Sequence, residues 1–456
     1  MIVNIKANLE KAIEDIVQLA TSEGEPRWSV NIRKAGLVSA RTMPDIDPKN
    51  EAWRRTPARF FFPDRQQPIN LVGEKMVVNE FQTVSEDEAA LHAYGINSRS
   101  EAKDSAQAEA LTHGNYDSIN KDGVQILPMG QALKQVKGLN DFFFEAECHQ
   151  KDLSCALNAA LRTGGAYVEI APGAAPARAF HILHDIKQDP NSADQSAQPL
   201  HFSHSLIRAS ERAHAVVVES FQSQAGEALK AHSLIEFDIS SGAQVNYILV
   251  SDWAKEAACL TTIHARMGQD ASLKIIFAGI GAGLAKTFFS EDLNSPGSNA
   301  EIYGVVFTDN TARSDVDTYI HHKAPHSTSN VLFNCAVAGN SRSIFAGNIY
   351  VDGQAQKTDA YQKNQNLLLS PQARAESMPK LEIIADDVRC THGASFTNYD
   401  ENQLFYLQSR GLNEVEAKSL IISGFFREVV ERSDDQAVAN WLFVLTQSRF
   451  IHSNAS

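Results

Sequence analysis

The chain has 456 residues, which is more than one small hydrophobic core requires, so we expect two or three structural units. A formal net charge of -14 argues against a nucleic-acid-binding surface, because such a surface needs a basic face. The five cysteines are scattered without a disulfide-framework or CxxC pattern, which indicates a reducing compartment. We find no signal peptide, and the longest apolar run, 275–285, is far shorter than the ~20 residues of a membrane span. We therefore expect a cytoplasmic protein with no membrane partner.

Residues 1–163 are predicted to form an N-terminal region that is mostly helical or irregular. Leu9, Ile13 and Ile16 recur at helical spacing, and Gly24 with Pro26 is expected to end that helix. Further elements are expected in chain order: an irregular connector anchored by Trp53 and Phe60 to Phe62 at 41–64, a helix-forming stretch at 85–110, an extended piece with a turn at 121–139, and a helix at 152–162.

Residues 164–388 are predicted to form an all-β core. Short apolar runs follow one another between polar turns, and several alternate, as in 234–239, which is the pattern of a half-buried strand. No helix-length periodic segment interrupts them, so βαβ units are not expected. Periodicity leaves a sandwich and a parallel β-helix open. Stacked coils would explain the many short strands, and their exposed edges would need capping by the flanking helices or pairing with a related subunit.

Residues 389–456 are predicted to form a C-terminal helical region. Asp400 with Gln403, and Asn413 with Glu416, have the spacing of capping boxes, and Gly411 is placed to end the first of these helices. A third helix is expected to begin at Asp434 or Asp435. Aromatic side chains fall on more faces than one packing seam needs, which predicts a partner surface here; they are Phe425, Phe426, Trp441 and Phe443.

Cys390 and His392 are the candidate metal ligands. They follow the apolar run 381–385 and lie two residues apart, so on a strand they share one face, and Gly393 is expected to break that strand. A thiolate with an imidazole suits zinc, copper or iron–sulfur chemistry, but two ligands do not complete a site. The alternative is a buried structural cysteine beside a turn histidine.

Asp315, Asp317, Tyr319 and His321 alternate along a predicted strand and form a second candidate site. They could provide a metal or acid–base site, and the two aspartates could serve a carbohydrate-active enzyme. A polar ladder on the outside of a β-helix is the commoner arrangement, and the missing secretion signal argues against a polysaccharide substrate. The glycines before Lys286 lack the spacing of a phosphate loop, so any nucleotide hydrolysis would come from a partner chain.

Seven short sequence motifs, in a fixed order, give the chain a resemblance to a known family. Their order is AQKTDAYQ (355–362), NLLLS (366–370), PKLEI (379–383), ADDV (385–388), CTHGA (390–394), LFYL (404–407) and SRG (409–411). On these words the chain resembles the SufB/SufD family of iron–sulfur cluster assembly proteins, in its SufD branch. The resemblance is dense over 313–430 and thinner back to residue 164. The family usually has a threonine and then a glycine where this chain has Ser395, Phe396 and Thr397.

The resemblance implies a right-handed parallel β-helix flanked by helical regions at both ends. It implies a scaffold without turnover chemistry, which pairs through the β-helix with a SufB-type paralogue and binds a SufC-type ABC ATPase at its C-terminal helices. A transient iron–sulfur cluster or iron would then meet Cys390 and His392 at the paralogue interface, with ATP-driven closure exposing them. A SufB-like homodimer is the alternative pairing, and no motif speaks for or against a flavin.

Overall fold

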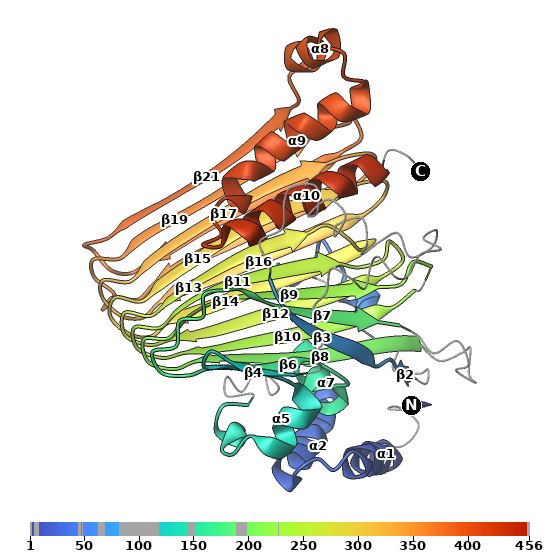
Figure 1. Cartoon of the computed structure of the whole chain (residues 1–456), viewed down its shortest axis with the longest axis vertical. Coiled ribbons are helices and arrows are strands. Elements are labelled where there is room, and N and C mark those ends of the chain that lie inside the picture. Colours follow the sequence, from blue (N-terminus) through green and yellow to red (C-terminus); the bar gives the residue numbers. More distant parts are fainter. Residues whose placement is uncertain are drawn as a thin grey trace.

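The computed structural model describes residues 2–3, 9–43, 47, 49–62, 69–81, 118–143, 152–187, 198–226 and 228–453. Two long sheets of mostly parallel strands face each other and form a β-helix, with helices at both ends of the chain (Figure 1). The predicted fold class, a mainly β protein with a parallel β-helix and flanking helices, is confirmed. The stretch predicted to be helix-forming at 85–110 lies outside the described residues.

Each coil of the β-helix contributes one strand to sheet A and the next strand to sheet B. The coils of sheet A are β8 (Gln198–Ala209), β10 (Lys230–Ile239), β12 (Ala258–Met267), β14 (Leu284–Leu293), β16 (Arg313–His322), β18 (Arg342–Val351) and β20 (Arg374–Ile383). Those of sheet B are β7 (Phe180–Ile186), β9 (His214–Ser223), β11 (Gln244–Asp252), β13 (Ser272–Gly279), β15 (Asn299–Thr308), β17 (Thr328–Val337), β19 (Asp359–Leu368) and β21 (Arg389–Asn398). Strands of consecutive coils pair in parallel without a shift, so equivalent residues stack in rows.

Side chains alternate between the two faces of each strand. Every second side chain points into the space between the two sheets, called the lumen here, and joins one continuous apolar core. The turns stack as well: Asn310 (φ 52°) and Gly339 (φ 59°) occupy equivalent corners of successive coils, and Asn340 N donates to Asn310 O at 2.7 Å. A β-carbon at Gly339 would lie 2.8 Å from Asn310 N, so the close stacking of these corners favours glycine.

The N-terminal region adds both strands and helices to the start of the β-helix. Its elements are β1 (Ile2–Val3), α1 (Leu9–Ser22), α2 (Arg27–Thr42), the 3-10 turns η1 (Ala58–Phe60) and η2 (Leu139–Asp141), β2 (Ile69–Leu71), β3 (Glu74–Glu80), β4 (Ile119–Lys121), β5 (Val124–Pro128), α5 (Met129–Gln135), α7 (Leu153–Leu161) and β6 (Ala166–Ile170). The predicted helices at 9–24 and 152–162 are confirmed by α1 and α7. Helix α2 was not predicted, because Pro26 was taken only as a stop. Proline also fits the start of a helix, and here it is the residue that precedes the first turn of α2.

The C-terminal helices are α8 (Glu401–Ser409), α9 (Glu414–Val430) and α10 (Gln436–Ser453). The capping box of Asn413 and Glu416 is present, whereas Asp400 caps α8 without help from Gln403. Helices α9 and α10 cover the outer face of sheet B (Figure 1), where Phe426 and Trp441 are buried against strand residues. The aromatic residues that suggested a partner surface therefore pack within the chain. None of the described helices has both the length and the apolar character needed to cross a bilayer.

Two expectations near the end of the β-helix are wrong. Gly393 does not break the strand, because β21 continues to Asn398 and pairs with β19 along its whole length. Hydrogen bonds from a neighbouring strand stabilise a backbone that glycine alone would leave flexible. Strand β21 also lies beyond residue 388, where we placed the boundary of the β-helix core. The wider division into three regions stays a prediction.

Candidate functional site

Cys390 and His392 lie on β21, the last strand of sheet B in the described part of the chain. Cys390 is the register partner of Ala360, and His392 is the register partner of Gln362. Ala360 and Gln362 are both buried in the lumen, so Cys390 and His392 also face the lumen side of the last coil. Two residues along a strand separate their Cα atoms by about 6.6 Å. The structure therefore puts both predicted ligands on one face, at the open end of the β-helix.

Several side chains at this last coil are exposed where those of the coil beneath are buried. Ile383 is 40% exposed, whereas Val351, its register partner one coil earlier, is 0% exposed. Phe396 is 49% exposed, whereas its partner Asn366 is 1% exposed. Ile384, just after β20, is 60% exposed. Because β20 and β21 also end their sheets, the described chain presents both an apolar surface and unpaired strand edges at this end.

Cys390 is half-buried and lies against a small apolar cluster that includes Val351, Ala355 and Ala360. Burial raises the pKa of its thiol, and the nearby carboxylate of Asp359 raises it further, while a hydrogen bond with the Ala360 backbone partly offsets both effects. The thiol is therefore neutral at physiological pH in the chain by itself. A metal ion would have to displace this proton in order to bind the sulfur.

His392 is exposed, so its ring is accessible to an incoming group. Within the described residues, no group of three or more His, Cys, Asp and Glu side chains is placed to hold a metal ion. Cys390 and His392 thus supply two donors of the soft-to-borderline kind, and further ligands would have to come from outside the described chain. Their role as metal ligands stays a prediction.

Three buried amides, called the amide floor here, lie in the coil directly beneath this pair. They are Gln362, Asn364 and Asn366 of β19, each no more than 1% exposed. One coil deeper, their register partners are Val331, Phe333 and Cys335. On sheet B, the lumen-facing side chains therefore change from mostly apolar to amide immediately below the open end. The three amides lie two residues apart along the sequence. This alternation could have predicted that they share one face of a strand.

The second candidate site lies on the outer face of sheet A. Asp315 and Asp317 both bind the ammonium of Lys286, with Nζ–Oδ2 distances of 2.9 and 2.6 Å. Burial raises the pKa of Asp317 to about 6, and the neighbouring Asp315 adds to this, although Lys286 opposes it. His321 is not part of the group, because its ring lies between Asp292 and Asp352. Lys286, which sequence reasoning used only to reject a phosphate loop, is thus the buried cation that both aspartates share, and it balances one of their two charges.

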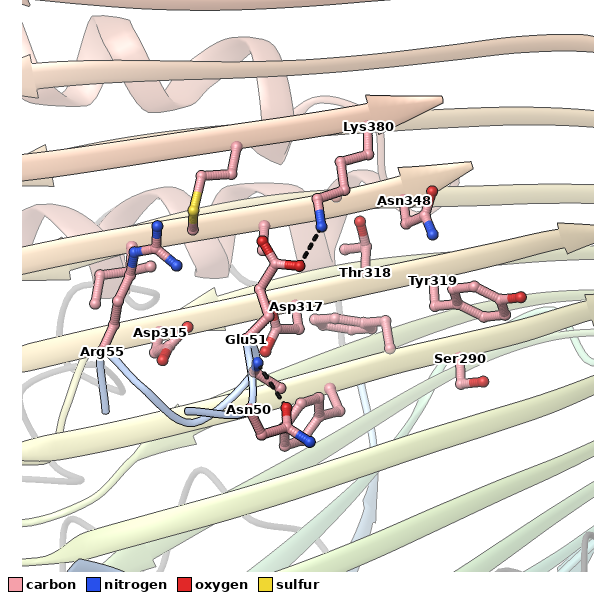
Figure 2. Close-up of a pocket in the computed structure, with 17 residues that line it drawn as sticks. Asn50, Glu51, Arg55, Ser290, Asp315, Asp317, Thr318, Tyr319, Asn348 and Lys380 are labelled. Atoms are coloured by element: carbon pink, nitrogen blue, oxygen red, sulfur yellow. Dashed lines mark hydrogen bonds and ion pairs between the residues drawn. The ribbon is translucent and has the colours of Figure 1, made fainter. Parts of the chain in front are cut away.

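A cavity of about 350 Å³ lies beside Asp315 and Asp317, under the segment around Glu51 and Arg55 (Figure 2). Lys380 pairs with Glu51 across its mouth, as Figure 2 shows. The two aspartates are held by a lysine beneath them rather than left available for a substrate. This arrangement favours the structural interpretation of the pair over that of a general acid and base.

Two further cysteines and a histidine precede the β-helix in the sequence. Cys148 and His149 lie outside the described residues, and Cys155 is buried in α7 among the N-terminal helices. Gly279 ends β13, and Lys286 lies on β14, so the glycine-rich stretch connects two strands and does not open a helix as a phosphate loop would.

Comparison with known proteins identifies the family. The family model described as the SufBD core domain of the SUF system for FeS cluster assembly matches residues 191–425. A SufBD family protein of Mycobacterium leprae is 30% identical over 239 residues, covering 51% of this chain and 60% of that protein. The iron–sulfur cluster assembly protein SufD of Escherichia coli is 27% identical over 289 residues, covering 63% of this chain and 67% of SufD. The chloroplast protein ABCI7 of Arabidopsis thaliana is 28% identical over 224 residues, which cover 49% of this chain and 47% of ABCI7. The chain therefore belongs to the SufBD family of iron–sulfur cluster assembly proteins.

Proposed function

We propose that this chain is a SufD-like accessory subunit that holds iron or a nascent iron–sulfur cluster between itself and a SufB-type paralogue. The observation that carries the proposal is the uncovered last coil, where inward-facing side chains such as Phe396 are exposed while their partners one coil deeper are buried. A second β-helix seated on this end would bury that surface and close over Cys390 and His392. It would also supply the ligands that the two residues lack.

The same proposal places an ABC-type ATPase on the C-terminal helices. Helix α8 supports this, because none of its nine residues is buried and it protrudes from the rest of the molecule (Figure 1). Phe405 and Tyr406 of α8 are 73% and 56% exposed. ATP binding would act on the cluster site only if it favours one arrangement of the two β-helices over another. The chain itself would carry out no turnover chemistry.

We place this assembly in the cytoplasm. All four cysteines that the structure describes are free thiols, which fits a reducing compartment.

The proposal is tested by co-expression with a SufB-type chain and an ABC-type ATPase. We expect native mass spectrometry to show one copy of this chain with one SufB-type chain and two ATPase subunits. His392→Ala should leave this assembly intact and abolish cluster formation, followed by absorbance after anaerobic reconstitution. His214→Ala, which changes an exposed histidine far from the open end, is the matched control. A normal cluster yield in His392→Ala would contradict the proposed site, and a stable homodimer that excludes the SufB-type chain would contradict the proposed pairing.

A further inference from the structure

Three arginines form a row on the outer face of sheet A. Arg313, Arg342 and Arg374 are the first residues of β16, β18 and β20, and they are register partners on these adjacent strands. Arg313 lies two residues before Asp315, so the two side chains share the outer face. Because adjacent strands lie about 4.8 Å apart, the row places one arginine on each of three consecutive coils at close spacing.

Arg55, from the segment that crosses sheet A, adds a fourth guanidinium group to this row. Its Nε lies 2.8 Å from Glu376 Oε2, and Arg342 binds the other oxygen of the same carboxylate. Arg313 Nη1 donates to the main-chain oxygen of Arg55 at 3.1 Å. These contacts bring arginines from three elements together, and the four residues Arg55, Arg313, Arg342 and Arg374 are called the arginine cluster here.

The negative charge beside the arginine cluster does not balance it. Within the part of the chain that the structure describes, Glu376 is the one carboxylate that forms an ion pair with the cluster. Arg313 and Arg374 form no ion pair there, and Arg374 Nη1 donates to main-chain oxygens, those of Pro371 and Ala373, at 2.9 Å. The chain as a whole has a net charge of -14, so this excess of positive charge is a local feature.

The arginines of the cluster repel one another. Burial lowers the pKa of Arg342, and the positive charges of Arg313 and Arg55 lower it further, while Asp315 partly opposes them. A bound anion would relieve this repulsion. Arg374 is exposed, and the side chain of Arg342 is 34% exposed, so an anion can reach the cluster from the solvent.

A small anion fits the arginine cluster better than an acidic protein segment does. The positive charge is concentrated around one carboxylate, and the chain that carries Arg55 lies over sheet A, which keeps a flat protein surface away (Figure 2). Guanidinium groups bind phosphate oxygens through pairs of N–H donors. Arg55 also lines the cavity of about 350 Å³, which offers space for the body of an organic phosphate.

We propose that the arginine cluster binds the phosphate group of a small molecule. Arg313 and Arg374 donate hydrogen bonds to the phosphate oxygens, and Arg342 and Arg55 add positive charge. Free phosphate and an organic phosphate share this chemistry. The site lies on the outer face of sheet A, whereas the candidate metal ligands face the lumen side, so the inference goes beyond the proposed function and does not depend on it.

The test is calorimetric titration of the full chain with inorganic phosphate and with phenyl phosphate at constant ionic strength. Arg313→Gln and Arg374→Gln each remove one cationic donor, and we expect each to weaken binding about tenfold. Arg27→Gln, which removes an exposed arginine of α2, is the matched control and should bind as the unchanged chain does. Thermal melting of each variant separates a loss of binding from a loss of structure.

Glu376→Gln changes binding in the opposite direction. This substitution removes the carboxylate that competes with phosphate for Arg342 and Arg55, so we expect tighter binding, which a purely structural cluster would not show. Tighter binding of phenyl phosphate than of inorganic phosphate would identify an organic ligand, and equal binding would identify free phosphate; both support the inference. It would be overturned by absent phosphate binding, by an equal loss in Arg27→Gln, or by binding of polyglutamate in place of either phosphate.

Discussion

Glu291 on β14 points into the apolar lumen, where its register partners on the neighbouring strands are Ala265 and Ile320. Neither carboxylate oxygen has a hydrogen-bond partner in the described ranges. Burial alone raises the pKa of this carboxyl group to about 8. A single residue in the middle of the core thus makes the stability of the protein depend on pH.

We predict that Glu291→Gln removes a loss of stability between pH 5 and pH 8. An unfolded chain releases this proton near the ordinary pKa of 4.5, whereas the folded chain keeps it up to about pH 8. Stability contributed by this group is therefore complete below pH 4.5 and falls as the pH rises, by on the order of 4 kcal/mol across this range. Glutamine cannot ionise, so denaturant unfolding at pH 5 and pH 8 should show a smaller decline for the variant. Equal declines in both proteins would contradict the prediction.

Helix α8 receives little stabilisation from the rest of the described chain. A nine-residue helix is marginal in water, and none of its residues is buried against the rest of the described chain. Its cap at Asp400 and the left-handed Gly411 after it (φ 100°) define where the helix begins and ends, but they do not hold it against the body.

We predict that Phe405→Asp abolishes co-purification of the ATPase and leaves the thermal melting temperature within about 1 °C, because an exposed side chain contributes little to folding. Phe60→Asp, a change at an exposed aromatic residue on the N-terminal segment, is the control and should keep the ATPase bound. Hydrogen exchange of residues 401–409 should slow when the ATPase binds. Retention of the ATPase by Phe405→Asp would place the docking surface elsewhere.

Much of this architecture can be predicted at the level of elements, because alternating apolar positions and polar turns have a local physical cause. Alternation shows that Cys390 and His392 share a face, but it does not show which face meets the lumen, since that depends on how the coils close. Gly393 shows a second limit of sequence-based prediction. Pairing of β21 with β19 keeps the strand continuous through the glycine, and this pairing cannot be seen in the local sequence. The partnership of Lys286 with Asp315 was likewise hidden, because register between coils joins residues far apart in sequence.

In the whole molecule, a strap formed by residues 50–62 crosses the outer face of sheet A and ties early coils to the last one. At one end, Nε2 of His232 on β10 lies 3.0 Å from the main-chain oxygen of Phe61. At the other end, Arg55 binds Glu376 of β20 with an Nε–Oε2 distance of 2.8 Å. Between them Trp53 packs against Phe288, with ring centroids 5.6 Å apart. Coils of a solenoid ordinarily contact only their neighbours, so this strap adds long-range coupling.

We predict that Trp53→Ala lowers the free energy of unfolding by about 3–5 kcal/mol, because Trp53 is only 6% exposed and removing it leaves a cavity under the strap. The loss should speed hydrogen exchange in β20 and β21 more than in β8 and β10, where other contacts remain. Phe60→Ala, which removes a ring that is 42% exposed, should cost less than about 1 kcal/mol. Equal exchange rates in the last coil of both proteins would show that the strap does not couple the two ends.

The uncovered last coil also has a consequence for how a cell must produce this protein. A β-helix end that is apolar and edged with unpaired strands can stack on the wrong surface of another copy, and a contact of that kind repeats without closing. Copies whose last coil stays uncovered would then grow into fibres or precipitate. Under the pairing proposed above, we therefore expect cells to make the two subunits in matched amounts and to degrade surplus copies.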